Sequence, residues 1–176
     1  TLTREREAAV EKMEALGANS DSQTQRTLLR YMVQDDNTLL RPLAASRLGE
    51  IGDAALIDEL ISLTTSSEDV EIRILAVQVL GEIGHEDTVD ALCNALHDDP
   101  DSEVRVRAAL ALGKTGNKLA IGSLSQAMQR DPDVKVRQHA IEALGIIGDE
   151  ALIEALVKIM ETDSNKETRT FAAEAL

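Results

Sequence analysis

Residues 101–117 have the sequence DSEVRVRAALALGKTGN, and residues 133–149 have the sequence DVKVRQHAIEALGIIGD. Each stretch begins with Asp, has Arg at its fifth position, Leu-Gly at its twelfth and thirteenth, and Gly at its sixteenth. The two stretches start 32 residues apart, so the chain repeats one pattern at a fixed interval. A fixed period of about 20 to 50 residues is the signature of a repeat protein.

The same pattern extends along the chain at the same spacing. Leu-Gly pairs occur at Leu16-Gly17, Leu48-Gly49, Leu80-Gly81, Leu112-Gly113 and Leu144-Gly145. An Arg lies seven residues before each later Leu of the series, at Arg41, Arg73, Arg105, Arg137 and Arg169. A helix-capping Asp or Asn lies four residues before each Arg, at Asn37, Asp69, Asp101, Asp133 and Asn165. Composition alone does not produce so many matches at one spacing, so we predict a repeat protein.

Each unit is predicted to contain two helices. The first begins at an Asp or Asn cap and has apolar residues at helical spacing, such as Leu56 and Leu60. The second buries a stripe such as Ile72, Ala76 and Leu80 and ends at Gly. A single pair cannot bury these faces, so we predict an all-α fold, an α-solenoid (superhelix) with inner and outer layers of helices. Pro42 should delay or kink the start of its helix.

The two ends of the chain differ from the interior units. Residues 1–17 are predicted to form an N-terminal capping helix, because Ala9 and Lys12 replace the Arg and the small core residue. Residues 18–176 are predicted to form one continuous domain of about five helix pairs. The C-terminal segment KETRTFAAEAL resembles an interior helix without a polar cap after it. We expect further repeats, a partner or a second copy of the chain, in a homo-oligomer, to cover that uncapped end.

The composition excludes several functional classes. The chain has 18 basic and 32 acidic residues, a formal charge of −14, and only two aromatic residues, Tyr31 and Phe171. Proteins that bind single-stranded nucleic acid stack bases on aromatic side chains, and membrane-spanning proteins carry aromatic belts. A strongly acidic surface also repels phosphate. We therefore expect no nucleic acid and no membrane as partners. The single cysteine permits a reducing compartment, and we expect a cytoplasmic protein.

The segments at residues 101–117 and 131–156 resemble the HEAT-like repeats of the phycobilin (PBS) lyase type. The resemblance covers about residues 18–176 and implies inner helices that line a concave protein-binding surface. It also implies a structural ladder, in which the recurring Arg and the cap Asp bridge adjacent repeats. The ladder arginines would be Arg41, Arg73, Arg105, Arg137 and Arg169, and the aspartates would be Asp69, Asp101 and Asp133. We prefer this structural role to ligand binding for these residues.

No catalytic, cofactor-binding or metal-binding pattern emerges from the sequence, so we predict that the protein is not an enzyme. The HEAT-type deoxyhypusine hydroxylases, which the repeat resembles in architecture, have His-Glu pairs directly after the ladder Arg to bind two irons. The matching pairs here include Ile74-Leu75, Val106-Arg107 and Gln138-His139. The single His-Glu pair, His85-Glu86, falls at a predicted helix cap. Cys93 occupies an apolar position of the repeat, which is typical of a buried, unreactive thiol.

The inner helices carry a stripe of residues that the repeat leaves free to vary. The candidate partner-binding residues are Leu39, Leu43, Ile74, Leu75, Gln78, Val106, Arg107, Leu110, Gln138 and His139. The apolar members would form a patch across three repeats with a polar margin, as partner-binding surfaces do. Two interpretations stay open: a partner protein docks on this patch, or the side chains are largely buried between adjacent inner helices.

We therefore predict a non-catalytic scaffold, without a cofactor, that binds a partner protein on its concave face. One alternative is a subunit of a bilin lyase or of a related cofactor-attachment or chaperone factor. In that case Arg107 and His139 would contact a propionate or a ring nitrogen, although the inner face lacks the aromatic wall that a large conjugated ligand requires. A second alternative is a regulatory repeat module of a larger protein.

Overall fold

The computed structural model describes residue 11 and residues 21–35, 39–148 and 152–176. The predicted capping helix over 1–17 lies outside the described residues except for Glu11, and so does the cap residue Asn37. The α-helices are α2 (Ser22–Gln34), α3 (Leu40–Ile51), α4 (Ile57–Ser66), α5 (Val70–Ile83), α6 (Val89–Asp98), α7 (Ser102–Thr115), α8 (Ile121–Arg130), α9 (Val134–Ile147), α10 (Leu152–Thr162) and α11 (Lys166–Glu174). Three short 3-10 helices are η1 (Ala54–Leu56), η2 (Glu86–Thr88) and η3 (Lys118–Ala120).

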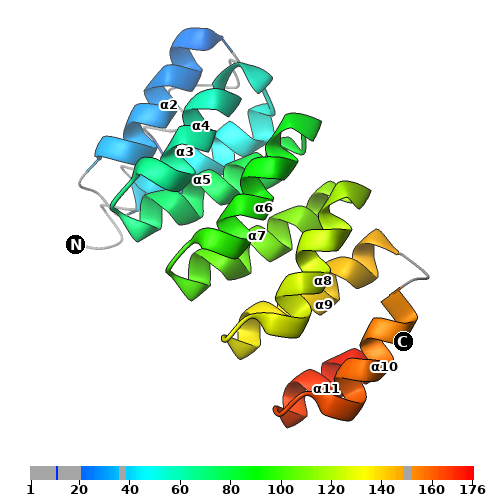
Figure 1. The fold of residues 1–176 in the computed structure, drawn as a ribbon. Helices are drawn as coiled ribbons and strands as arrows, with labels where there is room; N and C mark the ends of the chain where they lie inside the picture. Colours follow the sequence, from blue (N-terminus) through cyan, green and yellow to red (C-terminus); the bar gives the residue numbers. More distant parts are fainter. Residues whose placement is uncertain (1–10, 12–20, 36–38, 149–151) are drawn as a thin grey trace.

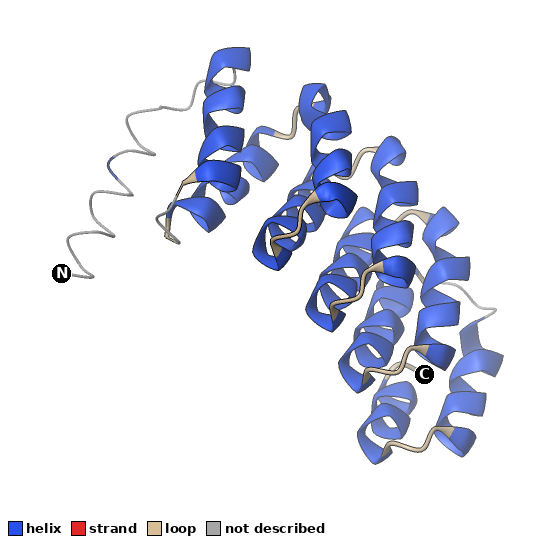
Figure 2. Cartoon of the chain, turned by 60° about the vertical axis from the view of Figure 1, so that its left-hand side comes forward, coloured by secondary structure: helices blue, strands red, loops and turns tan. Residues whose placement is uncertain are grey.

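The helices stack in two layers. Each of α2, α4, α6, α8 and α10 packs against the helix that follows it, which gives five pairs. The first helices of the pairs form an outer layer and the second helices form an inner layer, and the pairs follow an arc (Figure 1, Figure 2). Neighbouring inner helices among α3, α5, α7 and α9 pack closely, whereas neighbouring outer helices barely touch, so the inner layer lies on the concave side. The predicted α-solenoid is confirmed.

The helix ends lie where the repeat predicts them. Gly52, Gly84, Gly116 and Gly148 cap the inner helices with φ between 62° and 70°, the left-handed conformation that glycine adopts without strain. The side chains of Asp53, His85 and Asn117 cap the 3-10 helices, so a short 3-10 turn precedes each of the outer helices α4, α6 and α8. Inner helix α3 begins two residues later in the repeat than the other inner helices, with Pro42 in its first turn, as predicted.

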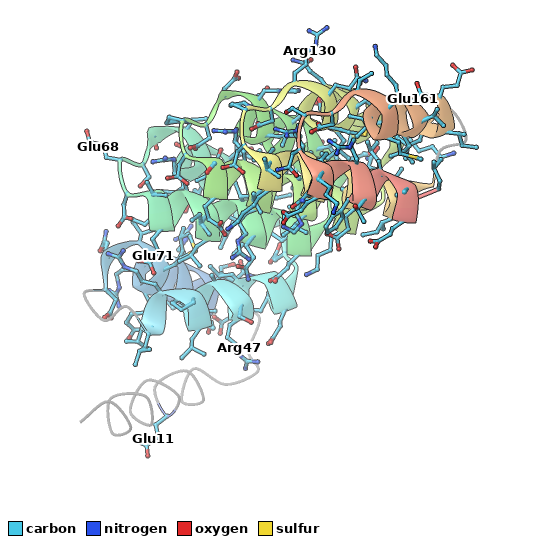
Figure 3. The ribbon with its side chains drawn as sticks, turned by 90° about the horizontal axis from the view of Figure 1, so that it is seen from below. Glu11, Arg47, Glu68, Glu71, Arg130 and Glu161 are labelled. Carbon is cyan, nitrogen blue, oxygen red and sulfur yellow. The ribbon has the colours of Figure 1, made fainter. Side chains whose placement is uncertain are left out.

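Small residues let the inner helices approach one another. A Cβ added to Gly81 or to Gly113 would lie 2.9 Å from the Cα of Ala111 or of Ala143 on the next inner helix. The equivalent alanines of the core, Ala44, Ala76, Ala108, Ala140 and Ala172, are fully buried. The remainder of the core is aliphatic, and Leu80, Leu112 and Leu144 are also fully buried. Charged side chains such as Glu68, Arg130 and Glu161 extend from the outside of the stack (Figure 3).

Arginine residues bridge adjacent repeats in a regular ladder. Arg73, Arg105 and Arg137 each donate through Nε to the Oδ2 atom of an aspartate 26 residues later, at 2.7, 2.9 and 3.0 Å. Their Nη2 atoms donate to the other carboxylate oxygen of the same aspartates, at 3.0, 3.1 and 3.2 Å. The acceptors are Asp99, Asp131 and Asp163. Each Nη1 atom also donates to carbonyl groups of the preceding loop. Every such arginine therefore fixes its own loop against the loop of the next repeat.

The ladder aspartates are not the ones that the sequence analysis assigned. Asp101 and Asp133 cap their own helices, because Oδ1 of each accepts the backbone N–H two residues later, and they do not bind the ladder arginines. The assignment of these two residues was wrong, because a capping carboxylate is directed at its own helix, while the residue two positions earlier faces the preceding repeat. Asp69 does accept from Arg41 Nη1, at 2.8 Å. It does so because Ser67 stands at the position that Asp99 and Asp131 hold in later repeats.

The two terminal ladder arginines are bound differently. Arg41 donates from Nη1 to Glu71 as well as to Asp69, at 3.1 and 2.8 Å, and its Nε donates to the carbonyl of Asp35. Asp69 and Glu71 are each more than two-fifths exposed, so this ion pair is more exposed to solvent than the ion pairs of Arg73, Arg105 and Arg137. Arg169 donates from Nη1 to the carbonyls of Asp163 and Ser164 in its own loop.

Candidate functional site

The predicted concave patch divides into buried and half-buried residues. Leu75 and Val106 are only 5% exposed and belong to the core, so their assignment to a binding surface was wrong. Adjacent inner helices lie so close that a side chain directed at the neighbouring helix is covered by it. Leu39, Leu43, Ile74 and Leu110 are half-buried, and the last three pack against the edge of the core. The continuous apolar patch across three repeats is therefore replaced by a narrower surface.

A hollow of about 370 Å³ opens on the inner layer between α5, α7 and α9. We call it the concave hollow, and its lining residues are Gln78, Glu82, Arg107, Leu110, Ala111, Lys114 and Ile146. Leu110 of α7, in the middle of the three helices, is half-buried and provides apolar surface. Ala111 also lines the hollow but is only 5% exposed. Ile146 of α9 is 63% exposed, which is unusual for a large aliphatic side chain. Three of the predicted residues, Gln78, Arg107 and Leu110, thus come together in one place.

The polar side chains of the concave hollow are engaged in pairs. Arg107 Nε donates to Glu103 Oε1 at 2.9 Å within α7, and both side chains are nearly half exposed. Lys114 Nζ of α7 lies 3.7 Å from Glu82 Oε1 of α5, which also accepts from Gln78 Nε2 at 3.3 Å. Exposed pairs of this kind contribute little to stability and exchange partners readily. An apolar centre with a charged margin is the usual composition of a protein-binding surface.

Gln138 and His139, the other two polar candidates, do not line the concave hollow. His139 Nδ1 lies 3.0 Å from Glu142 Oε2 on the same helix, and both Gln138 and His139 are half-buried. Of these two candidate ligand contacts, only Arg107 lines the concave hollow.

Four residues of the concave hollow were not predicted from the sequence: Glu82, Ala111, Lys114 and Ile146. Glu82, Lys114 and Ile146 are equivalent positions in three successive repeats, and Glu50 is the equivalent residue before them. An isoleucine in a series of charged residues was the signal that could have identified this surface. Only the contact between neighbouring inner helices, however, shows that these positions face the same hollow as Leu110.

A second apolar surface lies on the last helix pair. Its exposed side chains are Ile153, Val157, Met160, Phe171 and Leu176. Met160 is 36% exposed, whereas the equivalent residues Leu96 and Met128 are fully buried in the preceding repeats. Ile153 is 54% exposed, whereas its equivalents Ile57 and Val89 are at most 5% exposed and Ile121 is half-buried. Met160 and Ile153 of α10 are therefore more exposed than their equivalents in the preceding repeats.

The reactive side chains are isolated among the described residues. No group of three or more His, Cys, Asp or Glu side chains is arranged there to hold a metal ion. His85 Nδ1 accepts the N–H of Asp87 at 3.3 Å, which is the capping role predicted for it. Cys93 is half-buried, and desolvation raises the pKa of its thiol, which disfavours the reactive thiolate. None of the described helices combines the length and the apolar character that crossing a bilayer requires.

Comparison with known proteins agrees with the fold. The family model for HEAT repeats matches residues 57–133 and 92–176. The sequence gives no match to a curated protein. Among solved structures, the chain is similar to one from the complex of CpcE and CpcF of phycocyanin lyase from Nostoc sp. PCC7120, at 27% identity and a TM-score of 0.65. That match covers 86% of this chain but only 63% of the other.

A second similar structure is that of human deoxyhypusine hydroxylase in complex with glycerol, at 20% identity and a TM-score of 0.55. This match covers 99% of the present chain and 78% of the human protein, and at this identity it shows a shared fold alone. The family match spans well over half of the sequence and coincides with the helix pairs and the arginine ladder described above. The chain belongs to the family of HEAT-repeat proteins.

Proposed function

We propose that this protein is a non-catalytic scaffold that binds a partner protein in the concave hollow between α5, α7 and α9. The observation that carries this proposal is the exposure of Ile146, which is 63% exposed beside the half-buried Leu110. An exposed aliphatic side chain next to an apolar recess, with charges at the margin, is favourable for association because docking removes that surface from water. We expect the protein to act in the cytoplasm.

The composition of the hollow favours a protein segment as its ligand. Arg107, Lys114 and Glu82 offer charges of both signs around the apolar centre, and each is already within reach of a neighbouring charge. A partner with both polar and apolar side chains can pair with these charges and cover the apolar centre. A phosphate-rich ligand would be repelled by the net charge of −14. The concave hollow is also rigidly supported, because α5, α7 and α9 pack closely and the arginine ladder joins their loops.

The test compares two exposed apolar residues on different parts of the molecule. Ile146 lies in the concave hollow, whereas Leu119 in η3 is 75% exposed and lies outside it. Partners are purified from the native cells with the wild-type chain, with Ile146→Glu and with Leu119→Glu, and circular dichroism confirms that all three chains are folded. We expect Ile146→Glu to lose a partner that Leu119→Glu retains. Equal retention by both variants contradicts the proposal.

A bilin lyase subunit is the second candidate function. It is supported by the similarity to the phycocyanin lyase complex and by Arg107, whose guanidinium at the hollow could bind a propionate. Tyr31 and Phe171, the two aromatic residues of the chain, do not line the hollow. Incubation of the protein with a bilin should then give a shifted and intensified absorbance that Arg107→Gln weakens. An unchanged bilin spectrum contradicts this candidate and leaves the scaffold proposal intact.

Two further predictions concern the context of the chain. Self-association through the last helix pair is supported by the open apolar surface of Ile153, Val157 and Met160. In that case Met160→Glu should lower the mass measured by sedimentation. A role as a regulatory module of a larger protein stays a prediction that the length of the complete gene product would test.

A further inference from the structure

A second groove lies on the outer layer, between α2 and α4, away from the concave hollow. It encloses about 480 Å³, and its lining residues are Arg26, Leu29, Arg30, Val33 and Gln34 of α2 with Glu59, Ser62 and Leu63 of α4. We call it the α2–α4 groove, and the two helices lie side by side at the N-terminal part of the described stack (Figure 1). Leu29, Val33 and Leu63 are half-buried and pack against the core, so the groove has an apolar floor.

Three residues of this groove depart from the pattern of the repeat. Arg26 occupies the position of Asp58, Asp90, Gly122 and Glu154 in the later outer helices. Arg30 occupies the position of Ser62, Asn94, Gln126 and Lys158, and Val33 occupies that of Thr65, His97, Gln129 and Glu161. The position equivalent to Arg26 is therefore acidic in three of four later repeats. At these three positions α2 has basic or apolar residues where most of the later outer helices have acidic or polar ones, and all three positions line one groove.

The two arginines are available to a ligand. Both are exposed and lie one helical turn apart on the same wall of the groove. No carboxylate of a described residue lies within ion-pair distance of either, whereas Arg73, Arg105, Arg107 and Arg137 all have an acidic partner. The guanidinium of Arg30 lies 5.8 Å from the centre of the Tyr31 ring, a contact that leaves its hydrogen-bond donors open. In a chain of charge −14, the groove thus has two arginines one helical turn apart, with no acidic partner among the described residues, beside an apolar floor.

We propose that the α2–α4 groove binds an acidic amphipathic helix of a partner protein. Two carboxylates spaced four residues apart on such a helix match Arg26 and Arg30, which have the same spacing on α2. Its apolar side chains lie over Leu29, Val33 and Leu63, as in other complexes in which a helix occupies an apolar groove. A basic or polar residue on its other edge meets Glu59 and Ser62 of α4. This site is independent of the concave hollow and lies on the opposite layer.

The test uses three fluorescent helical peptides and the complete chain. The first peptide has leucines along one face and two glutamates four residues apart beside them. The second has lysines in place of these glutamates, and the third keeps the glutamates but has serines in place of the leucines. Binding is followed by fluorescence anisotropy. We expect the acidic amphipathic peptide to bind at least about tenfold more tightly than either of the others, because charge and apolar contact are both needed.

Charge reversal in the protein provides the decisive arm. The double variant Arg26→Glu and Arg30→Glu should bind the acidic peptide about tenfold or more weakly and bind the lysine peptide more tightly. Leu119→Glu, at an exposed residue outside both the α2–α4 groove and the concave hollow, should bind like wild type. If the reversed variant is unfolded by circular dichroism, the milder pair Arg26→Gln and Arg30→Gln replaces it, with loss of the acidic peptide expected. The proposal is overturned if the acidic peptide does not bind, if its binding ignores these substitutions, or if a single-stranded oligonucleotide binds in its place.

Discussion

Arg105 and Arg107 lie two residues apart on α7 and differ in burial and in their partners. The side chain of Arg105 is 11% exposed and holds Asp131 of the next repeat through two hydrogen bonds. The side chain of Arg107 is 46% exposed, pairs with Glu103 of its own helix and lines the concave hollow. Arg105 joins adjacent repeats, whereas Arg107 is exposed enough for a ligand to reach it. The same residue type therefore has a structural role or a candidate binding role according to its position in the repeat.

The two positions also differ in how much their residue type varies from one repeat to the next. The position of Arg105 is arginine in all five units from Arg41 to Arg169. The position of Arg107 is occupied by Leu43, Leu75, Arg107, His139 and Phe171 in the same units. Arg73, Arg105 and Arg137 bridge neighbouring loops in the same way at each central interface, so the same residue type recurs there. A residue on an open face is not held to one type, and such variable positions are where function can reside.

The largest expected effect is a difference in stability between variants of Arg105 and of Arg107. Arg105→Leu leaves the buried carboxylate of Asp131 without its partner, so the free energy of unfolding should fall by about 3–5 kcal/mol. Arg107→Leu removes an exposed pair within one helix and should change it by less than about 0.5 kcal/mol. Urea denaturation followed by circular dichroism measures both. If both variants lost a similar amount of unfolding free energy, the exposure of the two arginines would not separate a structural ion pair from a surface one.

The next effect concerns two glycines at equivalent positions of neighbouring units. A Cβ at Gly113 would lie 2.9 Å from Ala143, so Gly113→Ala should lower the stability by about 1–3 kcal/mol. A Cβ at Gly145 meets no atom within 4 Å, so Gly145→Ala should raise the stability by about 0.5–1 kcal/mol through its better helix propensity. Thermal unfolding of both variants checks the signs. Two stabilising substitutions would mean that the inner helices are not in close contact at Gly113.

A smaller effect is expected at Thr168, where the last pair departs from the central ones. Its hydroxyl is fully buried and has no hydrogen-bond partner among the described residues, whereas Val104 and Val136 hold the equivalent positions. Thr168→Val should therefore stabilise the protein by about 1 kcal/mol. Val136→Thr, the matched change in the central stack, should destabilise it by a similar amount. Equilibrium denaturation compares the two, and a loss of stability in Thr168→Val would indicate an unrecognised partner for the hydroxyl.

The smallest effect depends on pH and belongs to the outermost described rung of the ladder. The hydrogen bond from Arg41 is the largest cause that holds the pKa of Asp69 below its ordinary value of 3.8. A carboxyl whose pKa is lowered by folding stabilises the protein above its unfolded pKa and loses this contribution as the pH falls through the folded pKa. Asp69→Asn keeps an oxygen for the helix cap and removes the charge. The stability of wild type should thus fall more steeply than that of Asp69→Asn below about pH 4, and parallel curves would contradict the assignment.

Much of the fold follows from the sequence because each structural demand recurs in every unit. Local rules explain several features directly. The glycines cap the inner helices, small alanines occupy the close contacts, and α3 begins late, at Leu40, with Pro42 in its first turn. The assignment of Asp101 and Asp133 to the ladder was wrong because each lies two residues after another aspartate, Asp99 or Asp131. Sequence spacing does not show which carboxylate faces the preceding repeat, since that depends on the path of the loop.

The candidate site was harder to predict than the fold. Leu75 and Leu110 both belong to the variable stripe, yet the first is 5% exposed and the second lines the hollow. The difference arises from the separation of α5, α7 and α9, which no single repeat encodes. Ile146 was missed for the same reason: its neighbours in the hollow, Leu110 and Lys114, lie on another helix and more than 30 residues away in the sequence.

The most direct test of the central claim is the reactivity of individual arginines toward phenylglyoxal, with and without the partner protein that the wild-type chain captures. Arg107 lines the concave hollow, and Arg130 extends from outer helix α8 on the other side of the stack (Figure 3). Mass spectrometry reports the modification of each. If the partner docks on the inner face, its addition should protect Arg107 and leave Arg130 reactive. Protection of Arg130 with Arg107 unchanged would contradict the account.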